Sequence, residues 1–253
     1  MTDTLHGATA VITGASSGIG AATALAMAAN GATVALFARR KNLLDTLTRR
    51  INDTHNEAAR AYAVDITDAP AVRAALDKVT QDLRGIDILV NCAGTGTWGP
   101  AAEADLSKWH AMVEVNLNGV LNTTHAALPH LTRAAQGARG VADIVTVSSI
   151  AGRKVPGANS NVYAATKHAV AAFSEALRQE LADRHVRVGL IEPGIVTTEM
   201  TTSGDPHAPD ARNPSGLGVL DPSDIADAIT YMTSRPRHAA VNEILIRPTE
   251  QVL

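Results

Sequence analysis

The sequence predicts an α/β fold: a single doubly wound domain in which helices cover both faces of a parallel sheet. Short runs of consecutive apolar residues alternate along the whole chain with longer segments of helical periodicity. Strands that are apolar on both faces belong to parallel sheets covered on both sides. A glycine-rich turn follows the first apolar run, which is where folds of this class hold a phosphate.

The first half of the chain contains four expected strands. They span residues 9–12, 32–37, 60–66 and 86–90. An alanine-rich helix leads to the stop signal Asn30-Gly31, and helices are expected over 41–51 and 69–83. Each apolar run is thus followed by a helix, as the doubly wound arrangement requires.

The second half repeats this alternation. A long helix over residues 108–131, interrupted near Pro129, precedes a strand at 141–147. A helix through Tyr163 precedes a strand at 186–191. A further helix begins at Asp221-Pro222, and a last strand covers 243–246. No linker or change in composition divides the chain, so residues 1–253 are predicted to form one domain.

Residues 197–220 are rich in glycine and proline and have no clear periodicity. A long loop in a compact domain is usually functional or disordered. The strand before it should end at the same edge as Tyr163, so a substrate lid is the favoured interpretation and disorder the alternative.

Composition excludes several classes of protein. The chain is 45% hydrophobic and 19% charged, with a net charge of −3, which argues against disorder and gives no sign of a nucleic-acid surface. The single cysteine, Cys92, rules out an internal disulfide and a multi-cysteine zinc site, and no metal is expected. The N-terminal residues show no leader, and the apolar run 21–29 is too short to span a bilayer. We therefore expect a cytoplasmic protein with no membrane contact.

Tyr163 and Lys167 are four residues apart on an expected helix, so they lie on one face. A free phenol has a pKa near ~10. A cation about 4 Å away, at an effective dielectric of about 20, contributes roughly 4 kcal/mol, or about three pKa units. The pair predicts a phenol tuned for general acid/base catalysis, to which Ser149 could add a hydrogen bond to the substrate oxygen. The alternative is a surface helix that carries both residues by chance.

The glycine-rich turn between the first strand and the first helix reads Gly14-Ala15-Ser16-Ser17-Gly18-Ile19-Gly20. Glycine allows a tight turn and close backbone approach, and the helix N-terminus offers amide donors to a pyrophosphate. The spacing differs from the usual dinucleotide fingerprint, so an ordinary strand-to-helix turn is the alternative.

The second strand is followed by Ala38-Arg39-Arg40-Lys41, where an NAD-binding fold would place an acid for the ribose. Cations at a helix N-terminus oppose its dipole, so three in a row are unfavourable unless they meet an anion. The 2′-phosphate of NADP would be that anion. Arg39 and Arg40 therefore favour NADP(H) over NAD, and a solvated helix start is the alternative.

Taken together, the motifs resemble the short-chain dehydrogenase/reductase family, in order and over essentially the whole chain. They are Thr13-Gly14-x-x-x-Gly18-x-Gly20, Asn91-Cys92-Ala93-Gly94, Asn116, Ser149, Tyr163-x-x-x-Lys167 and Pro193-Gly194. The resemblance implies a Rossmann-like fold and an NADP(H)-dependent oxidoreductase that moves a hydride between nicotinamide and a carbonyl or alcohol carbon. The tail, residues 243–249, is similar to an NADP-using subgroup that contains clavulanic acid dehydrogenase.

The resemblance also implies the roles of single residues. Tyr163 would exchange the proton, Lys167 would lower its pKa and hold the nicotinamide ribose, and Ser149 would orient the carbonyl. Asn116 would anchor a relay water; satisfying helix backbone is the alternative. The coenzyme would contact Asp65 and Ile66 at the adenine, Asn91, Ala93 and Gly94 near the adenosine ribose, and Val196 and Thr198 at the nicotinamide amide. Pro193 and Gly194 would also bind the coenzyme.

Two features depart from the family pattern. Cys92 stands where the family usually has a second asparagine, and we assign it no redox role. The gap between Ser149 and Tyr163 is one residue longer than the commonest spacing. The loop over 153–159 would absorb the extra residue; otherwise Ser148 competes for the role of Ser149.

Two other classes compete with this reading. An extended-family epimerase or dehydratase would need a C-terminal substrate domain for which the chain has no room. A non-catalytic nucleotide-sensing or scaffold protein on the same fold is the remaining alternative, which retention of the catalytic residues disfavours. The helix of Tyr163 carries further small and apolar residues, Ala165, Ala169, Ala172, Phe173 and Ala176, and family members commonly associate through it. We expect a homo-oligomer, a tetramer or a dimer.

Overall fold

A computed structural model describes residues 4–202 and 218–252. Seven parallel strands form one sheet in the order β3-β2-β1-β4-β5-β6-β7. The strands are β1 (Thr9–Thr13), β2 (Thr33–Ala38), β3 (Ala59–Ala63), β4 (Ile88–Asn91), β5 (Ala142–Val147), β6 (Val186–Pro193) and β7 (Glu243–Ile246). The predicted α/β fold is confirmed.

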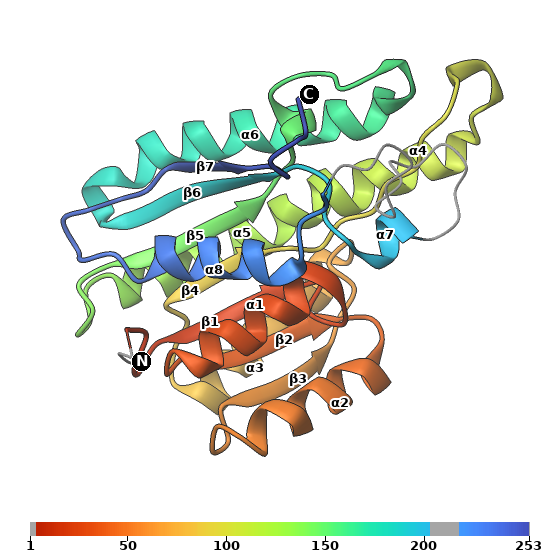
Figure 1. Cartoon of the computed structure of the whole chain (residues 1–253). Coiled ribbons are helices and arrows are strands. Elements are labelled where there is room, and N and C mark those ends of the chain that lie inside the picture. Colours follow the sequence, from red (N-terminus) through yellow and green to blue (C-terminus); the bar gives the residue numbers. More distant parts are fainter. Residues whose placement is uncertain (1–3, 203–217, 253) are drawn as a thin grey trace.

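Helices cover both faces of this sheet (Figure 1). One face carries α1 (Gly18–Ala29), α2 (Lys41–Asn52) and α8 (Pro222–Thr233), and the other carries α3 (Ala69–Leu83), α5 (Gly119–Ala134) and α6 (Asn161–Leu181). Successive residues of β1 feed the two cores in turn, Ile12 toward α1 and Val11 toward α3 and α5, because side chains alternate across a strand. Buried Leu, Ile and Val on both sides supply the main stabilising term.

The order of the strands fixes where a ligand can bind. Strand β1 lies between β2 and β4. The chain adds β2 and β3 on one side of β1, and then returns to add β4 to β7 on the other side. All strands are parallel, so their carboxyl ends meet at one edge, and the crevice at the reversal point is where such sheets bind ligands. The turn from β1 to α1 lies at this point.

The third strand is shorter than the predicted 60–66 and ends at Ala63. Asp65 turns away from the ladder because its Oδ1 accepts hydrogen bonds from the backbone N–H and the hydroxyl of Thr67, at 3.0 and 2.9 Å. Side chains of this kind compete locally with strand pairing. Asp65 and Ile66 therefore lie in the loop at the carboxyl edge.

The predicted interruption near Pro129 is wrong, because α5 runs through Pro129 to Ala134. The irregularity lies earlier. Between α4 (Leu106–Val113) and α5, residues Glu114–Asn118 form a π-helical turn. The N–H of Gly119 bonds to the carbonyl of Glu114, five residues back. Such a turn re-aims the side chains within it, and Asn116 is one of them.

The predicted lid over 197–220 falls only partly on described residues, and 203–217 lie outside them. The described part contains the short helix α7 (Glu199–Thr202) and a parallel bridge between Val196 and Leu220. In the part of the chain that the structure describes, no helix has the length and apolar character needed to cross a membrane.

Candidate active site

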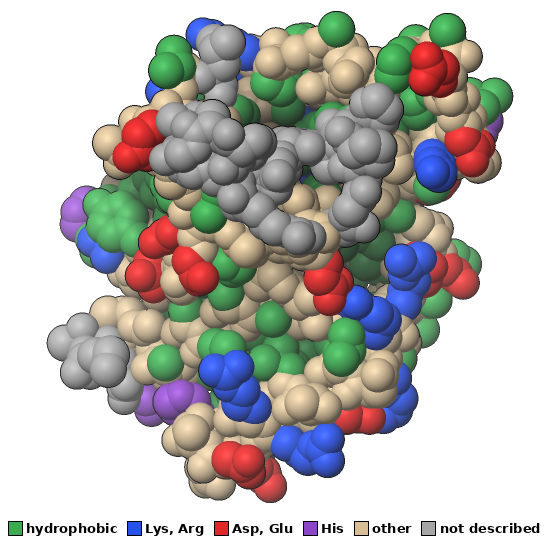
Figure 2. Space-filling model, turned by 45° about the vertical axis from the view of Figure 1, so that its right-hand side comes forward, with side chains coloured by type: hydrophobic (Ala, Val, Ile, Leu, Met, Phe, Trp, Pro, Cys, Tyr) green, Lys and Arg blue, Asp and Glu red, His purple; other side chains and the backbone are tan. Residues whose placement is uncertain are grey.

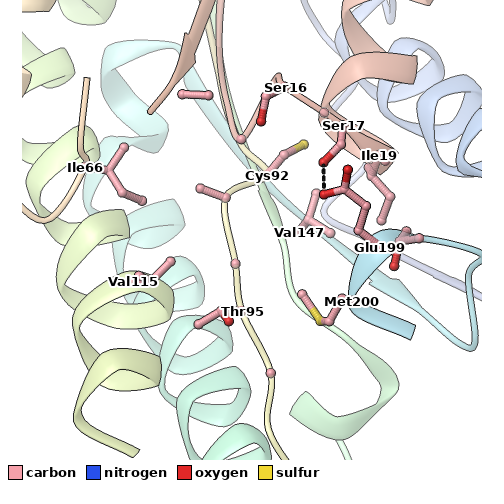
Figure 3. Close-up of a pocket in the computed structure, with 18 of the residues that line it drawn as sticks. Ser16, Ser17, Ile19, Ile66, Cys92, Thr95, Val115, Val147, Glu199 and Met200 are labelled. Atoms are coloured by element: carbon pink, nitrogen blue, oxygen red, sulfur yellow. Dashed lines mark hydrogen bonds between the residues drawn. The ribbon is translucent and has the colours of Figure 1, made fainter. Parts of the chain in front are cut away.

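A cleft of about 700 Å³ opens at the carboxyl edge of the sheet, a size typical of small-molecule and cofactor sites. The β1–α1 turn, the ends of β2, β4, β5 and β6, and helices α6 and α7 all contribute to it. Figure 3 shows Ser17, Ile19 and Glu199 on one side, with Ile66 and Val115 across from them. Segments far apart in the sequence thus meet in one cavity.

The glycine turn is packed too closely for any side chain at two positions. A Cβ on Gly14 would lie 2.8 Å from Cα of Ala93, and one on Gly20 would lie 2.4 Å from the carbonyl oxygen of Gly14. Gly18 also has a φ of +52°, which disfavours L side chains. These contacts bring the loop against the end of β4 and hold the start of α1 open to a ligand.

The N-terminus of α1 suits a phosphate. Ser17 stands at the N-cap in an extended conformation, but within the described residues its side chain makes no capping bond, and the first turn holds no acidic residue. The first N–H groups of a twelve-residue helix therefore face the cleft with the positive end of its dipole. These residues fit the pyrophosphate of a nicotinamide dinucleotide.

Both predicted arginines line the same cleft. Arg40 reaches the glycine turn, with Nη2 at 3.0 Å from the hydroxyl of Ser16 and 2.7 Å from that of Ser17. Arg39 stands 3.9 Å from the carboxylate of Asp65, and its side chain is 74% exposed. On the face in Figure 2, Lys and Arg side chains are interspersed with Asp and Glu.

Tyr163 projects from α6 into the cleft and packs against Trp98, with ring centroids 5.4 Å apart. Burial raises the pKa of its phenol above the usual value, and a hydrogen bond with Ser149 acts in the opposite direction. The net shift is upward, opposite to the lowered pKa expected from the spacing of Tyr163 and Lys167. The phenol is therefore protonated at neutral pH.

Lys167 is buried beside this phenol. Its Nζ donates a 2.9 Å hydrogen bond to the carbonyl of Val147 and lies 5.7 Å from the ring centroid of Tyr163. The side chain is only 6% exposed, and burial lowers the pKa of Lys167 to about 8. The ammonium is thus placed at the end of β5, beside the phenol and within the cleft.

The two serines at the end of β5 have different environments. Ser148 is buried, and its hydroxyl donates to the carbonyl of Lys167 at 3.1 Å. Ser149 caps the short turn Ile150–Gly152, accepts from the N–H of Ala151 at 3.1 Å, and interacts with Tyr163. Between Ser149 and Tyr163 the chain forms two short turns, Ile150–Gly152 and Ala158–Ser160. The geometry therefore favours Ser149 over Ser148 as the partner of Tyr163.

The two asparagines lie behind the cleft rather than on its wall. Asn116 is buried and bonds to both backbone groups of Thr95, at 2.8 and 2.9 Å, and to the hydroxyl of Thr166 at 3.2 Å. Asn91 is buried among threonines, accepting from Thr123 at 2.7 Å. Both therefore hold the loop after β4 and its neighbours in place.

The other predicted site residues line the cleft. They are Gly14, Ser16, Ser17, Gly18, Ile19, Gly20, Arg39, Arg40, Asp65, Ile66, Ala93, Gly94, Ser149, Tyr163, Lys167, Pro193, Gly194, Val196 and Thr198. Sequence reasoning missed several wall residues, among them Thr95, Val115, Glu199 and Met200. Glu199 directly follows a predicted contact, Thr198, and adjacency was the only signal for it.

Cys92 also lines the cleft, and burial raises the pKa of its thiol to about 12. The thiol is therefore neutral and unreactive at physiological pH. Among residues 4–202 and 218–252, no group of three or more His, Cys, Asp or Glu side chains could hold a metal ion.

Comparison with known sequences identifies the family. The short chain dehydrogenase family pattern matches residues 8–208. An uncharacterized oxidoreductase of Staphylococcus saprophyticus is 37% identical over 94% of this chain and 96% of its own length. A glycine betaine reductase of Emericella nidulans is 40% identical over 98% of this chain, but the chain spans only about a fifth (19%) of that protein.

Solved structures agree with this assignment. An alcohol dehydrogenase from Thermococcus sibiricus, complexed with 5-hydroxy-NADP, has a TM-score of 0.85 at 29% identity, over 96% of this chain and 97% of that one. A 3-ketoacyl-(acyl-carrier-protein) reductase from Brucella melitensis, complexed with NADH, has a TM-score of 0.84 at 30% identity, over 96% and 98%. The chain belongs to the short-chain dehydrogenase/reductase family and is an oxidoreductase that uses a nicotinamide coenzyme.

Proposed function

We propose that this enzyme uses NADPH to reduce a carbonyl group of a small molecule to the alcohol, and that it also catalyses the reverse reaction. One observation carries the proposal: the glycine turn with its open helix N-terminus and the Tyr163, Ser149 and Lys167 group line the same cleft. A dinucleotide bound to the turn therefore reaches a proton donor at the other end. The bound coenzyme would supply the hydride.

The protein supplies orientation and the proton. A protonated Tyr163 is a donor, so it can give its proton to the substrate oxygen as negative charge develops there. Ser149, beside the phenol, donates a second hydrogen bond to that oxygen. We assign Lys167 to the nicotinamide ribose, Asn116 to holding the loop after β4, and the glycine turn to the pyrophosphate.

The preference for NADPH rests on Arg39 and Arg40 and on the absence of an acid at Ala38. The relatives do not decide it, because one similar structure holds an NADP analogue and another holds NADH. A guanidinium can grip a phosphate through paired, charge-assisted hydrogen bonds. The likeness of the tail to the clavulanic acid dehydrogenase subgroup stays a prediction.

We also propose that residues 1–253 work as one domain, in the cytoplasm, as a homo-oligomer that packs through α6. The residues Ala165 and Ala176 are exposed on this helix, and small side chains allow close helix packing. Light scattering in solution should give a multiple of 26.3 kDa. A particle of the single-chain mass at micromolar concentration would contradict this assembly.

The test of the proposed reaction is a panel of aldehydes and ketones, each incubated with the protein and NADPH while the absorbance of the reduced nicotinamide is followed. We expect consumption of NADPH that depends on the carbonyl compound. A protein that binds NADPH but consumes it with no member of a broad panel would support a non-catalytic nucleotide sensor instead.

A further inference from the structure

A carboxylate stands at the phosphate end of the cleft. Glu199, the first residue of α7, places Oε2 at 2.9 Å from Nη1 of Arg40 and 3.0 Å from the hydroxyl of Ser17. Figure 3 shows Glu199 and Ser17 facing each other, with their hydrogen bond dashed. The proposed reaction gives this carboxylate no role. The phosphates of a bound dinucleotide are themselves anions, so a further negative charge at this end would not help to bind them.

The three side chains form a closed ring, which we call the Arg40–Ser17–Glu199 cluster. Arg40 donates to the Ser17 hydroxyl at 2.7 Å, Ser17 donates to Glu199, and Glu199 pairs with Arg40. The Nε and Nη2 groups of Arg40 also donate to the hydroxyl of Ser16, at 3.2 and 3.0 Å. The guanidinium is therefore held over the glycine turn and engaged on both of its edges.

The donors that hold Glu199 are also those that a phosphate needs. Guanidinium and hydroxyl groups bind carboxylate and phosphate oxygens in the same way. Two anions on one guanidinium would repel each other, and like charges juxtaposed at a binding site oppose association. A phosphate that takes Arg40 and Ser17 must therefore release Glu199 from them.

We propose that Glu199 is an internal counter-ion, which the phosphate of the coenzyme displaces from Arg40 and Ser17, and that it thereby sets the affinity of the cleft for coenzyme. The proposal rests on the proposed function in one respect, namely that a dinucleotide binds in this cleft. Two phosphates qualify: the pyrophosphate that both coenzymes carry, and the 2′-phosphate that only NADPH carries.

The displacement also couples coenzyme binding to α7. Glu199 ties this short helix to the glycine turn, so its release removes one connection between α7 and the nucleotide end of the cleft. The side chains of Arg40 and Glu199 are 44% and 62% exposed, so solvent screens their pair. Exposed pairs are weak, and removing the competition should tighten binding by about two- to fivefold.

The experiment is isothermal titration of the wild type and of Glu199→Gln with NADPH, NADH and adenosine 2′,5′-bisphosphate. We expect tighter binding to the variant. A gain for NADPH and the bisphosphate alone would identify the 2′-phosphate as the displacing group, and an equal gain for NADH would identify the pyrophosphate. Glu57→Gln, which removes the same charge from an exposed position in the loop between α2 and β3, should bind all three as the wild type does.

Unchanged or weaker binding by Glu199→Gln would overturn the proposal, because Glu199 would then orient Arg40 instead of competing for it. A second comparison guards against an indirect effect: in an Arg40→Ala background the gain from Glu199→Gln should shrink, and an undiminished gain would refute displacement from Arg40. The titrations need no turnover, so a protein that binds coenzyme but reduces no carbonyl would refute the proposed reaction alone. A wild type that binds none of the three ligands would refute both.

Discussion

Two buried charged groups near opposite ends of strand β5, Lys167 and the cluster around Asp143, are held in different ways. At the carboxyl end, Lys167 is buried with a backbone carbonyl, that of Val147, as its hydrogen-bond partner. At the amino end, Asp143 and Arg187 lie opposite each other in register, 2.7 Å apart, and Arg139 adds a second guanidinium at 3.1 Å. Burial disfavours the charge at both sites, since it lowers the pKa of Lys167 and raises that of Asp143, but at Asp143 two guanidinium groups oppose the effect.

The amino-end cluster is well satisfied. Arg187 donates to the carbonyls of Arg235 and Ala239 at 2.9 and 2.8 Å, and both Arg139 and Arg187 donate to the carbonyl of Thr233 at the end of α8. These bonds fasten α8 and the chain after it to the sheet. A buried charge is tolerated when its hydrogen bonds are complete.

The difference shows how one sheet serves two purposes. The Asp143 cluster at the amino edge fixes the fold, and Lys167 at the carboxyl edge is a charge whose proposed partner is the coenzyme. Residues at functional sites commonly cost stability. Substitutions at the carboxyl edge should therefore lower activity, and substitutions in the Asp143 cluster should lower the free energy of unfolding.

The largest effect should come from Tyr163→Phe. Loss of the phenolic oxygen removes the proton donor, so turnover should fall roughly 10²–10⁴-fold, while NADPH binding and the melting temperature stay close to those of the wild type. Steady-state rates, coenzyme titration and thermal unfolding check the three parts. Near-normal rates in this variant would refute the assignment of Tyr163.

Arg187→Ala should give the opposite result. It leaves Asp143 buried with one guanidinium fewer, which should cost about 3–5 kcal/mol of unfolding free energy. Denaturant unfolding measures this cost, and kcat of the folded fraction should not change. Lys78→Ala, which breaks an ion pair with Asp82 on α3 and removes a side chain that is 61% exposed, is the control and should unfold nearly like the wild type. Equal unfolding free energies of the two variants would show that the amino-end cluster stabilises the fold no more than an exposed ion pair does.

The next largest effect should be on the preference for NADPH over NADH. Changing Arg39 or Arg40 to Ser should weaken NADPH much more than NADH, by about 10- to 150-fold in kcat/KM for the arginine that meets the 2′-phosphate. Ala38→Asp combined with Arg39→Ser should invert the preference. Arg50→Ser, on the exposed side of α2, serves as the control. If neither arginine matters, both belong only to a solvated helix start.

The smallest effect concerns stability at the carboxyl edge. Lys167→Met should lower activity yet stabilise the protein without coenzyme by about 1–3 kcal/mol at neutral pH, because it removes a buried ammonium. The pKa of Lys167 in the folded protein, about 8, lies below its usual 10.5. The free-energy cost of burying the charged Lys167 is therefore full below about pH 8, and it disappears as the pH rises through 10.5. Unfolding curves across this range should converge at high pH, whereas a destabilised Lys167→Met at pH 7 would contradict the account.

Local spacing explains what the sequence could predict. Alternating apolar runs and helices predicted the sheet, and Gly14 and Gly20 were identifiable because a tight turn leaves no room for a Cβ. The four-residue spacing of Tyr163 and Lys167 placed both in the cleft. Each of these features can be recognised from residues that lie close together in the sequence.

What could not be predicted depends on contacts between distant segments. The pKa of Tyr163 goes up because of burial, which no spacing reveals, and Lys167 turns to Val147, twenty residues away. Glu199 pairs with Arg40 across the cleft, from a different strand end. The bonds of Asn116 to Thr95, twenty-one residues earlier in the chain, likewise depend on a contact that the local sequence does not show.

The most direct test of the central claim, that the carboxyl edge carries hydride transfer from NADPH to a carbonyl, is to follow the label from NADPH deuterated at its transferable position. With a carbonyl compound that the wild type reduces, the account predicts deuterium on the carbinol carbon of the alcohol, formed at a rate that falls with Tyr163→Phe and not with Arg187→Ala. Consumption of NADPH without deuterium in the alcohol would contradict it.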